Sequence, residues 1–97
     1  MRTVTVLLDP PLWPAHGRVW GHLVSDASLE ELHTFAAAAG IPARGFDRDH
    51  YDVPAERYEE LVALGVKLVD SRELVRRLRA SGLRVTAAQR RGAAEST

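Results

Sequence analysis

Short apolar segments alternate with segments of helical spacing along this chain, and no other feature constrains the fold as much. Residues 3–8 are β-branched and apolar, which is typical of a buried strand. Two further apolar segments, residues 41–46 and 66–69, each follow a segment of helical spacing. Strands that alternate with helices are usually joined by right-handed crossovers and lie in a parallel sheet. The order of segments therefore predicts an α/β fold.

The helical segments begin and end at recognisable residues. Ser28 can cap the first helix through the amide of Glu31, whose carboxylate would reach back, and Gly40 supplies a left-handed stop. Pro54 suits the first position of the second helix, because its missing amide needs no partner there. Asp70 can cap the third helix in the same way as Ser28 caps the first.

We expect one compact domain over residues 1–85 with the order β-α-β-α-β-α, in which the helices pack on a small, mostly parallel, three-stranded sheet. Residues 18–24 are expected to add one or two helical turns after the first strand. Residues 86–97 carry only small and polar side chains, which predicts a disordered tail.

Composition excludes several classes of protein. The 97 residues include no cysteine, so a disulfide scaffold, a thiolate nucleophile and a Cys-based zinc site are excluded. No apolar run approaches the about 20 residues that a membrane helix needs, and the chain begins without a signal core. We therefore expect a cytoplasmic protein with no membrane contact.

Charge is unevenly distributed although the formal net charge is zero. Residues 71–97 hold seven arginines against two glutamates, which favours either a basic region for nucleic acid or a helix whose dipole is complemented by its arginines. The second interpretation is preferred, because this region has no aromatic side chains that could stack on bases.

Two polar segments carry most of the candidate chemistry. Residues 47–53 hold three aspartates, a histidine and an arginine where an apolar segment gives way to a helix, the edge at which α/β folds bind ligands. Residues 9–26 can face them across the same edge. Each expected strand also ends in an aspartate: Asp9, Asp47 and Asp70. Such carboxylates can hold Mg²⁺ or Mn²⁺, although a single aspartate in a turn more often caps a helix.

The histidines extend this site. His50 and Asp52 are two residues apart and point the same way in an extended chain, while His22 and Asp26 would share a helical face. Imidazole–carboxylate sets ligate Zn²⁺, Mn²⁺ or Fe²⁺, or act without metal as a histidine base that an aspartate orients. The competing interpretation is that both histidines bind loop backbone. The candidate metal ligands are Asp9, His22, Asp26 and His50, the candidate catalytic residues are His22, His50 and Asp52, and the candidate anion-binding residues are Arg18 and Arg48.

The spaced motifs of this chain resemble those of small bacterial and phage proteins catalogued as a domain of unknown function, DUF4031. The resemblance covers about residues 3–83 and rests on Asp9, Gly17-Arg18, His22-Leu23-x-x-Asp26, Glu31-Leu32, His50-Tyr51-Asp52, Arg57 and Ala63-x-Gly65. It implies that six of the polar residues belong to a shared pattern, namely Asp9, Arg18, His22, Asp26, His50 and Asp52. It implies no activity.

Two classes of function follow from these observations. The first is a divalent-metal-dependent hydrolase or ligand-binding domain that acts on a phosphate-containing small molecule. The second is a non-enzymatic accessory domain that acts through homo-oligomerisation or a partner protein, and nucleic-acid binding by the arginine-rich end ranks third. The first predicts that His22, His50 and at least one aspartate converge within about 5 Å, whereas the second predicts that they are scattered.

Overall fold

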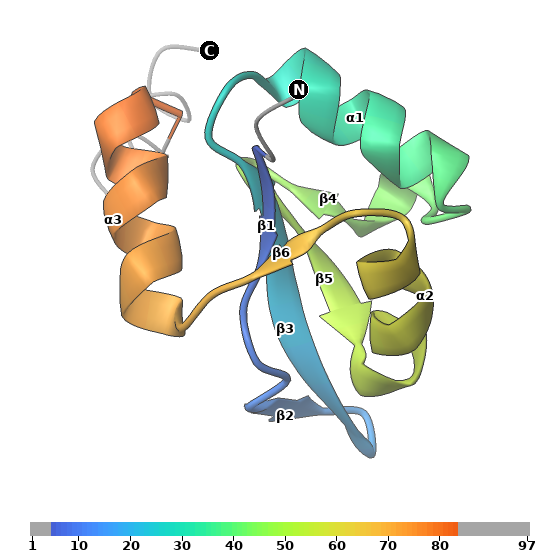
Figure 1. Cartoon of the computed structure of the whole chain (residues 1–97). Helices are drawn as coiled ribbons and strands as arrows, with labels where there is room; N and C mark the ends of the chain where they lie inside the picture. The colour runs from blue at the N-terminus through green and yellow to red at the C-terminus, as the bar shows by residue number, and fades with distance from the viewer. Residues whose placement is uncertain (1–4, 84–97) are drawn as a thin grey trace, which may run out of the picture.

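The computed structural model describes residues 5–83, which form three α-helices and a six-stranded sheet (Figure 1). The elements are, in chain order, β1 (Val6–Leu8), β2 (Trp13–Ala15), β3 (Arg18–Ser25), α1 (Leu29–Ala38), β4 (Phe46–Asp47), β5 (His50–Pro54), α2 (Tyr58–Ala63), β6 (Lys67–Leu68) and α3 (Ser71–Ser81). Single 3-10 turns, Ala43–Gly45 and Ala55–Arg57, precede β4 and α2. The tail expected at residues 86–97 lies outside the described residues.

The sheet is mixed and dominated by antiparallel pairs, so the expected three-stranded, mostly parallel sheet is wrong. Its strand order is β4-β5-β3-β1-β6, with β2 paired to β3. Within the described residues only β1 and β6 run parallel. The connection between these two strands contains β2, β3, α1, β4, β5 and α2, so the chain makes one parallel crossover where two were expected.

A tight turn at His16 and Gly17 is the physical reason for this difference. Both residues have positive φ angles, 51° and 73°, as in the two-residue turns that join antiparallel strands. The turn sends the chain back along β2 and on past β1, so residues 18–24 form the long strand β3 and the expected helical turns there are wrong.

The middle of the chain also differs from the expectation. Residues 41–46 form a 3-10 turn and the first residue of β4, whereas the buried strand is β5, whose Tyr51 and Val53 alternate inward. Pro54 ends β5, and the α-helix begins four residues later at Tyr58. Of residues 66–69, two form β6.

The helix caps agree with the sequence prediction at the first and third helices. The Ser28 hydroxyl accepts a 3.0 Å hydrogen bond from the amide of Glu31, and the Asp70 carboxylate accepts one of 2.7 Å from the amide of Glu73. The Glu31 carboxylate does not reach back to Ser28 as expected. It accepts a 2.7 Å hydrogen bond from the hydroxyl of Ser25 and ties α1 to the end of β3.

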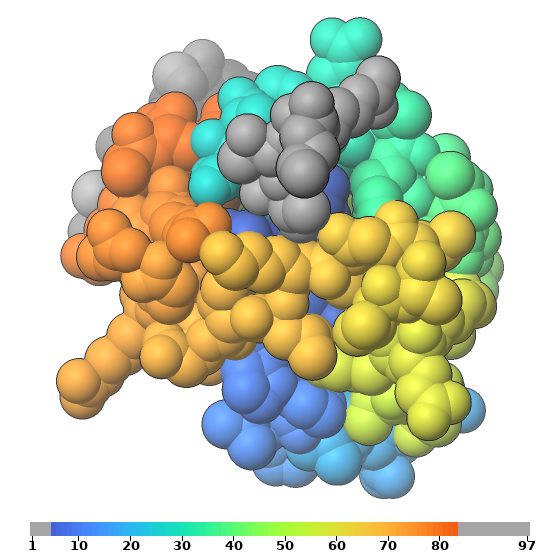
Figure 2. Space-filling model, in the orientation of Figure 1, coloured from blue at the N-terminus to red at the C-terminus, as the bar shows by residue number. Residues whose placement is uncertain are grey.

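Helices cover the two faces of the sheet unequally. Helices α1 and α2 lie on one side, over the main core that includes Leu8, Leu23 and Val53, and α3 lies on the other side (Figure 1). The space-filling view shows β6 between α3 and α2, with part of the N-terminal segment exposed below them (Figure 2). On its own face, α3 packs on Leu7 and Val24. The described residues include no helix that is long and apolar enough to cross a membrane.

Candidate metal centre

Two histidines and an aspartate meet on the face of the sheet that α3 covers only in part. His22 lies directly opposite Asp52 in the antiparallel pair of β3 and β5, so their side chains share a face. His50 is two residues before Asp52 on β5 and points the same way. One ligand atom from each of these three residues lies within 4.8 Å of the others. The predicted convergence within about 5 Å is therefore confirmed.

A carboxylate behind each imidazole sets its orientation. The buried Asp9 accepts a 2.6 Å hydrogen bond from the backbone amide of His22, and its other oxygen lies 3.1 Å from Nδ1 of the His22 ring. The fully buried Asp49 lies 2.7 Å from Nδ1 of His50. An imidazole that donates through Nδ1 has its lone pair on Nε2, and a ligating histidine is held in this way in most metal sites.

Asp9 is held as an anion by its surroundings. Burial by itself would raise its pKa, but hydrogen bonds from the ring and the amide of His22, the charge of that ring and a hydrogen bond from Ser71 together lower the pKa below the ordinary value. The Ser71 hydroxyl is 3.1 Å from the carboxylate and comes from the first residue of α3. The Asp9 carboxylate therefore joins three elements: the end of β1, the middle of β3 and the start of α3.

Asp52 presents a buried oxygen that accepts no hydrogen bond within the described residues. This oxygen, Oδ1, lies 3.2 Å from Nε2 of His50. When His50 donates through Nδ1 to Asp49, its Nε2 carries a lone pair, and two acceptors then face each other at that distance. A buried acceptor without a donor is unfavourable. A proton or a metal cation between the two acceptors would remove this repulsion.

The other residues singled out from the sequence lie elsewhere. Asp26 lies 3.9 Å from Arg77, at the far end of β3 from the histidines. Arg48 occupies the β4–β5 turn with a positive φ of 60° and lies 4.0 Å from Asp47. Arg18 begins β3 and lines a different cleft. Asp9 touches His22 but stands behind it, in the position of an orienting residue.

Sequence reasoning missed three residues of the site: Asp49, Ser71 and Tyr58. Asp49 adjoins His50, but neighbouring strand residues point to opposite faces, so only the turn after β4 allows this contact. The Tyr58 hydroxyl donates a 2.6 Å hydrogen bond to the backbone carbonyl of Asp9 from a distance of 49 residues in the chain. Such separations leave no local signal in the sequence.

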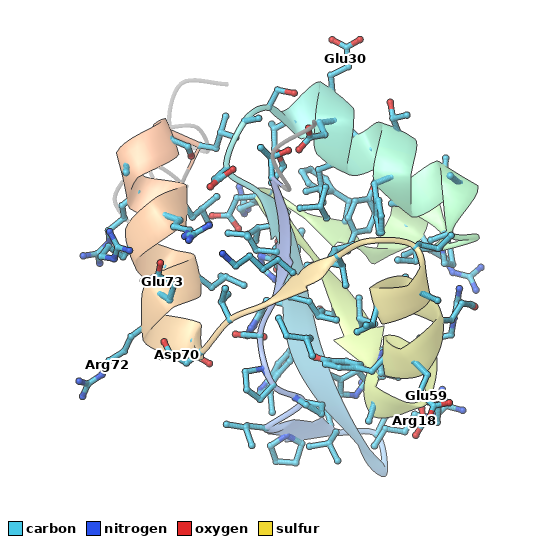
Figure 3. The ribbon with its side chains drawn as sticks, in the orientation of Figure 1. Arg18, Glu30, Glu59, Asp70, Arg72 and Glu73 are labelled. Atoms are coloured by element: carbon cyan, nitrogen blue, oxygen red, sulfur yellow. The ribbon has the colours of Figure 1, made fainter. Side chains whose placement is uncertain are left out.

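A cleft of about 370 Å³ opens beside the cluster. One wall consists of apolar side chains that include Leu74, Val75 and Leu78 of α3. The N-cap of this helix, Asp70, and Glu73 in its first turn are labelled in Figure 3. Trp13 lines the mouth and stacks on His22 with ring centroids 5.9 Å apart. The lining includes Asp9, Asp47 and Asp49 and no lysine or arginine of the described residues.

Comparison with known proteins places the whole site within one family. A family model described as "protein of unknown function (DUF4031)" matches residues 6–81, which include every residue of the His–Asp cluster and its supporting carboxylates. No curated protein and no solved structure matches the chain.

Proposed function

The chain belongs to the DUF4031 family of proteins of unknown function, and we propose that His22, His50 and Asp52 bind one divalent cation at a hydrolytic centre. The single observation that carries this proposal is the buried Oδ1 of Asp52, which faces an imidazole nitrogen at 3.2 Å and accepts no hydrogen bond within residues 5–83. A cation at this point would be shared by the carboxylate and both imidazoles.

The ligand set indicates a catalytic rather than a structural metal. Structural zinc sites are closed by four protein ligands, whereas catalytic zinc has three and keeps a position for water or substrate. Two histidines and one carboxylate suit Zn²⁺, and the same set with open positions also suits Fe²⁺ or Mn²⁺. Asp9 and Asp49 supply the supporting carboxylates that orient metal-bound histidines.

The cleft beside the cluster is where a substrate would be held. A Zn²⁺ held by His22, His50 and Asp52 would lower the pKa of a bound water to about 7 and so supply hydroxide near neutral pH. Asp47 lies opposite His50 in the β4–β5 pair and lines the same cleft, so its carboxylate can accept the proton from this water. In the reaction, oxygen from water is added to the substrate, the ester bond breaks and the leaving alcohol takes up a proton.

We propose a phosphate ester as the substrate, which can bind in the cleft only when the metal is present. The cleft is lined by three aspartates and by no lysine or arginine of the described residues, so it repels a phosphate while the cluster is empty. A divalent cation would reverse the sign of the local charge. Phosphate should therefore enter this cleft only together with the metal.

The decisive experiment is a thermal-shift and metal-content screen with Zn²⁺, Mn²⁺, Mg²⁺ and Ni²⁺. A cation at 100 times its dissociation constant should stabilise the protein by about 2.7 kcal/mol and raise Tm by about 10–20 °C. His22→Ala, His50→Ala and Asp52→Ala should each abolish this shift.

His16→Asn is the matched control for this screen. His16 is an exposed histidine of the β2–β3 turn outside the cluster, and asparagine tolerates its positive φ of 51°. This variant should keep the full shift. A wild-type protein that contains no metal and responds to none of the four cations would refute the metal centre.

One observation favours the alternative of an interaction domain. Leu12, Trp13 and Val19, all on or beside the β2–β3 hairpin, are 73%, 48% and 40% exposed. Neighbouring exposed apolar side chains are a common feature of partner-binding surfaces. If the metal screen is negative, the His–Asp pairs would act as ties between strands, and size-exclusion chromatography of a Trp13→Ser variant would test this surface.

A further inference from the structure

We propose that a second cleft, formed by Arg18, Arg44 and Arg57 at the free edge of β5, binds an oxyanion carried on a flat apolar group. The cleft shares the lining residue Asp52 with the metal centre, but the anion would bind through the arginines and needs no metal. It also differs from the expectation that Arg18 and Arg48 hold an anion beside His22, since Arg18 lines this cleft and Arg48 lies in the β4–β5 turn.

The cleft lies where β5 runs beyond its short neighbour. Strand β4 pairs only with His50 and Tyr51, so the residues from Asp52 to Pro54 have no partner strand on that side. The 3-10 turn Ala43–Gly45 and the turn before α2 border this edge and enclose a hollow of about 400 Å³. Each of these turns contributes one arginine.

The charges of this cleft are only partly balanced. Arg57 is held by a 3.0 Å hydrogen bond from its Nε to Glu60 and by a further bond to the carbonyl of Ala39. Arg18 and Arg44 make no ion pair or side-chain hydrogen bond with any residue between 5 and 83. Asp52 is the single carboxylate among the lining residues.

Three guanidinium groups line one hollow, and those of Arg18 and Arg44 have no carboxylate partner among residues 5–83, so an anion bound there would accept their charge-assisted hydrogen bonds. Guanidinium presents its donors as a planar fork that matches phosphate or carboxylate oxygens. Arg57 is fixed by its existing bonds and would hold one side of the anion, while Arg18 and Arg44 could move to contact the ligand without breaking an existing bond. This arrangement distinguishes the cleft from scattered surface arginines such as Arg72, which points away from the body of α3 (Figure 3).

The walls of the cleft indicate what the anion is attached to. Trp20, Ile41, Pro42 and Pro54 line it, and the Trp20 ring is fixed by a 2.9 Å hydrogen bond from Nε1 to the carbonyl of Ala15. Flat, rigid apolar walls favour a planar apolar group over a sugar or a flexible chain. The ligand class is therefore an aryl phosphate or an aryl carboxylate.

The test is a titration followed by amide NMR, carried out in EDTA so that the metal centre is empty. The probes are phenyl phosphate, benzoate and inorganic phosphate. We expect shifts at Trp20, Gly45 and Val53, with phenyl phosphate or benzoate binding several-fold more tightly than inorganic phosphate because of the apolar walls. The stronger of the two aryl probes identifies the oxyanion.

Single substitutions decide whether the arginines bind the probe. Arg18→Ala and Arg44→Ala should each lower the affinity for the tighter-binding aryl probe by about tenfold, the typical loss for one charge-assisted contact. Both side chains are exposed and unbonded within the described residues, so the fold should persist, which the spectra verify directly. Arg72→Ala, on α3, is the matched control and should leave the affinity unchanged.

Three outcomes would overturn the proposal. The first is no shift at the cleft with any probe. The second is an affinity that is the same in Arg18→Ala, Arg44→Ala and the wild-type protein. The third is an equal loss in Arg72→Ala, which would indicate general charge attraction. Since the titration contains no metal, none of these results tests whether the His–Asp cluster binds a cation.

Discussion

Asp9 connects more parts of the molecule than any other residue described at the site. Its carboxylate accepts hydrogen bonds from the amide of His22 and the hydroxyl of Ser71, and its carbonyl accepts one from Tyr58. The position of the His22 ring therefore depends on a buried charge that itself depends on α2 and α3. An orienting role of this kind can be separated from direct ligation by experiment.

Asp9→Asn should weaken metal binding without abolishing it. Loss of a supporting carboxylate typically lowers metal affinity by about 10–100-fold, because the ring loses its fixed tautomer and orientation. Competition with a chromophoric chelator measures this change. Asp26→Asn is the control, since Asp26 lies beside Arg77 and should leave the affinity unchanged. An equal loss in both variants would contradict the assignment of Asp9 as the orienting residue.

Gly21 is a glycine because two other groups occupy the space of a side chain. A Cβ there would lie 1.6 Å from the Tyr58 hydroxyl oxygen and 2.6 Å from the carbonyl oxygen of Asp9. Burial and the charge of Asp9 raise the pKa of Tyr58, so this hydroxyl remains a hydrogen-bond donor throughout the working pH range. Gly21 therefore permits the close approach of β3, β1 and α2.

Gly21→Ala should destabilise the protein by about 1–3 kcal/mol or more, as overpacking of a closed site does. Urea denaturation measures the free energy of unfolding. The double variant with Tyr58→Phe removes the closest contact, so its loss should be smaller than the sum of the two single losses. Strictly additive losses would show that the Tyr58 hydroxyl is not the obstacle.

At the scale of the element, α3 is stabilised by ion pairs within its own sequence. Glu73 accepts hydrogen bonds of 2.5–3.0 Å from Arg76 and Arg77, which lie three and four residues later, about one helical turn away. These hydrogen bonds lower the pKa of Glu73 to about 2. Arg76 and Arg77 are thus already paired, which leaves less of this helix for nucleic acid than its arginine content indicates.

The lowered pKa of Glu73 predicts a specific dependence of stability on pH. A carboxyl whose pKa is lower in the folded state stabilises the fold above its unfolded pKa, here 4.5, and this contribution is lost as pH falls towards about 2. Glu73→Gln should therefore be less stable than the wild-type protein at pH 7 and equal to it below pH 2, in scans of Tm against pH. Glu59→Gln, on α2, is the control and should follow the wild-type curve. A difference in Tm between Glu73→Gln and the wild-type protein that stays the same at all pH values would contradict the ion pairs.

At the scale of the whole molecule, the site exists because α3 is attached to only part of its sheet face. Leu74 and Leu78 pack on Leu7 and Val24, and the polar residues of β3 and β5 begin where this contact ends. The same helix thus closes a small core and forms one wall of the cleft. The opposite face has no such division, because α1 and α2 cover its core.

Leu78→Ala should destabilise the protein by about 2–5 kcal/mol, because this side chain is 1% exposed and its loss leaves a cavity between α3 and the sheet. Chemical denaturation measures the change. Leu64→Ala removes the same group from a position that is 51% exposed and should change stability by less than about 0.5 kcal/mol. Similar losses in both variants would show that α3 is not docked as described.

Local signals in the sequence were sufficient for the caps of the first and third helices and for the identity of the polar segments, but not for residues 18–24 or for the start of the second helix. Ser28 and Asp70 cap their helices as predicted, because a cap requires atoms only three residues apart. The convergence of His22, His50 and an aspartate was also predicted, since both polar segments were placed at one edge. That reasoning succeeded although the strand directions it used were wrong.

Strand direction and the supporting residues required the folded chain. The turn at His16 and Gly17 reverses the chain, but whether β3 then pairs with β1 and β5 depends on contacts between residues far apart in sequence. Asp49 contacts His50 because of the β4–β5 turn, and Ser71 contacts Asp9 because α3 begins beside the end of β1. Caps and turns are local and can be read from neighbouring residues, whereas pairing and register are set by burial of the whole sheet.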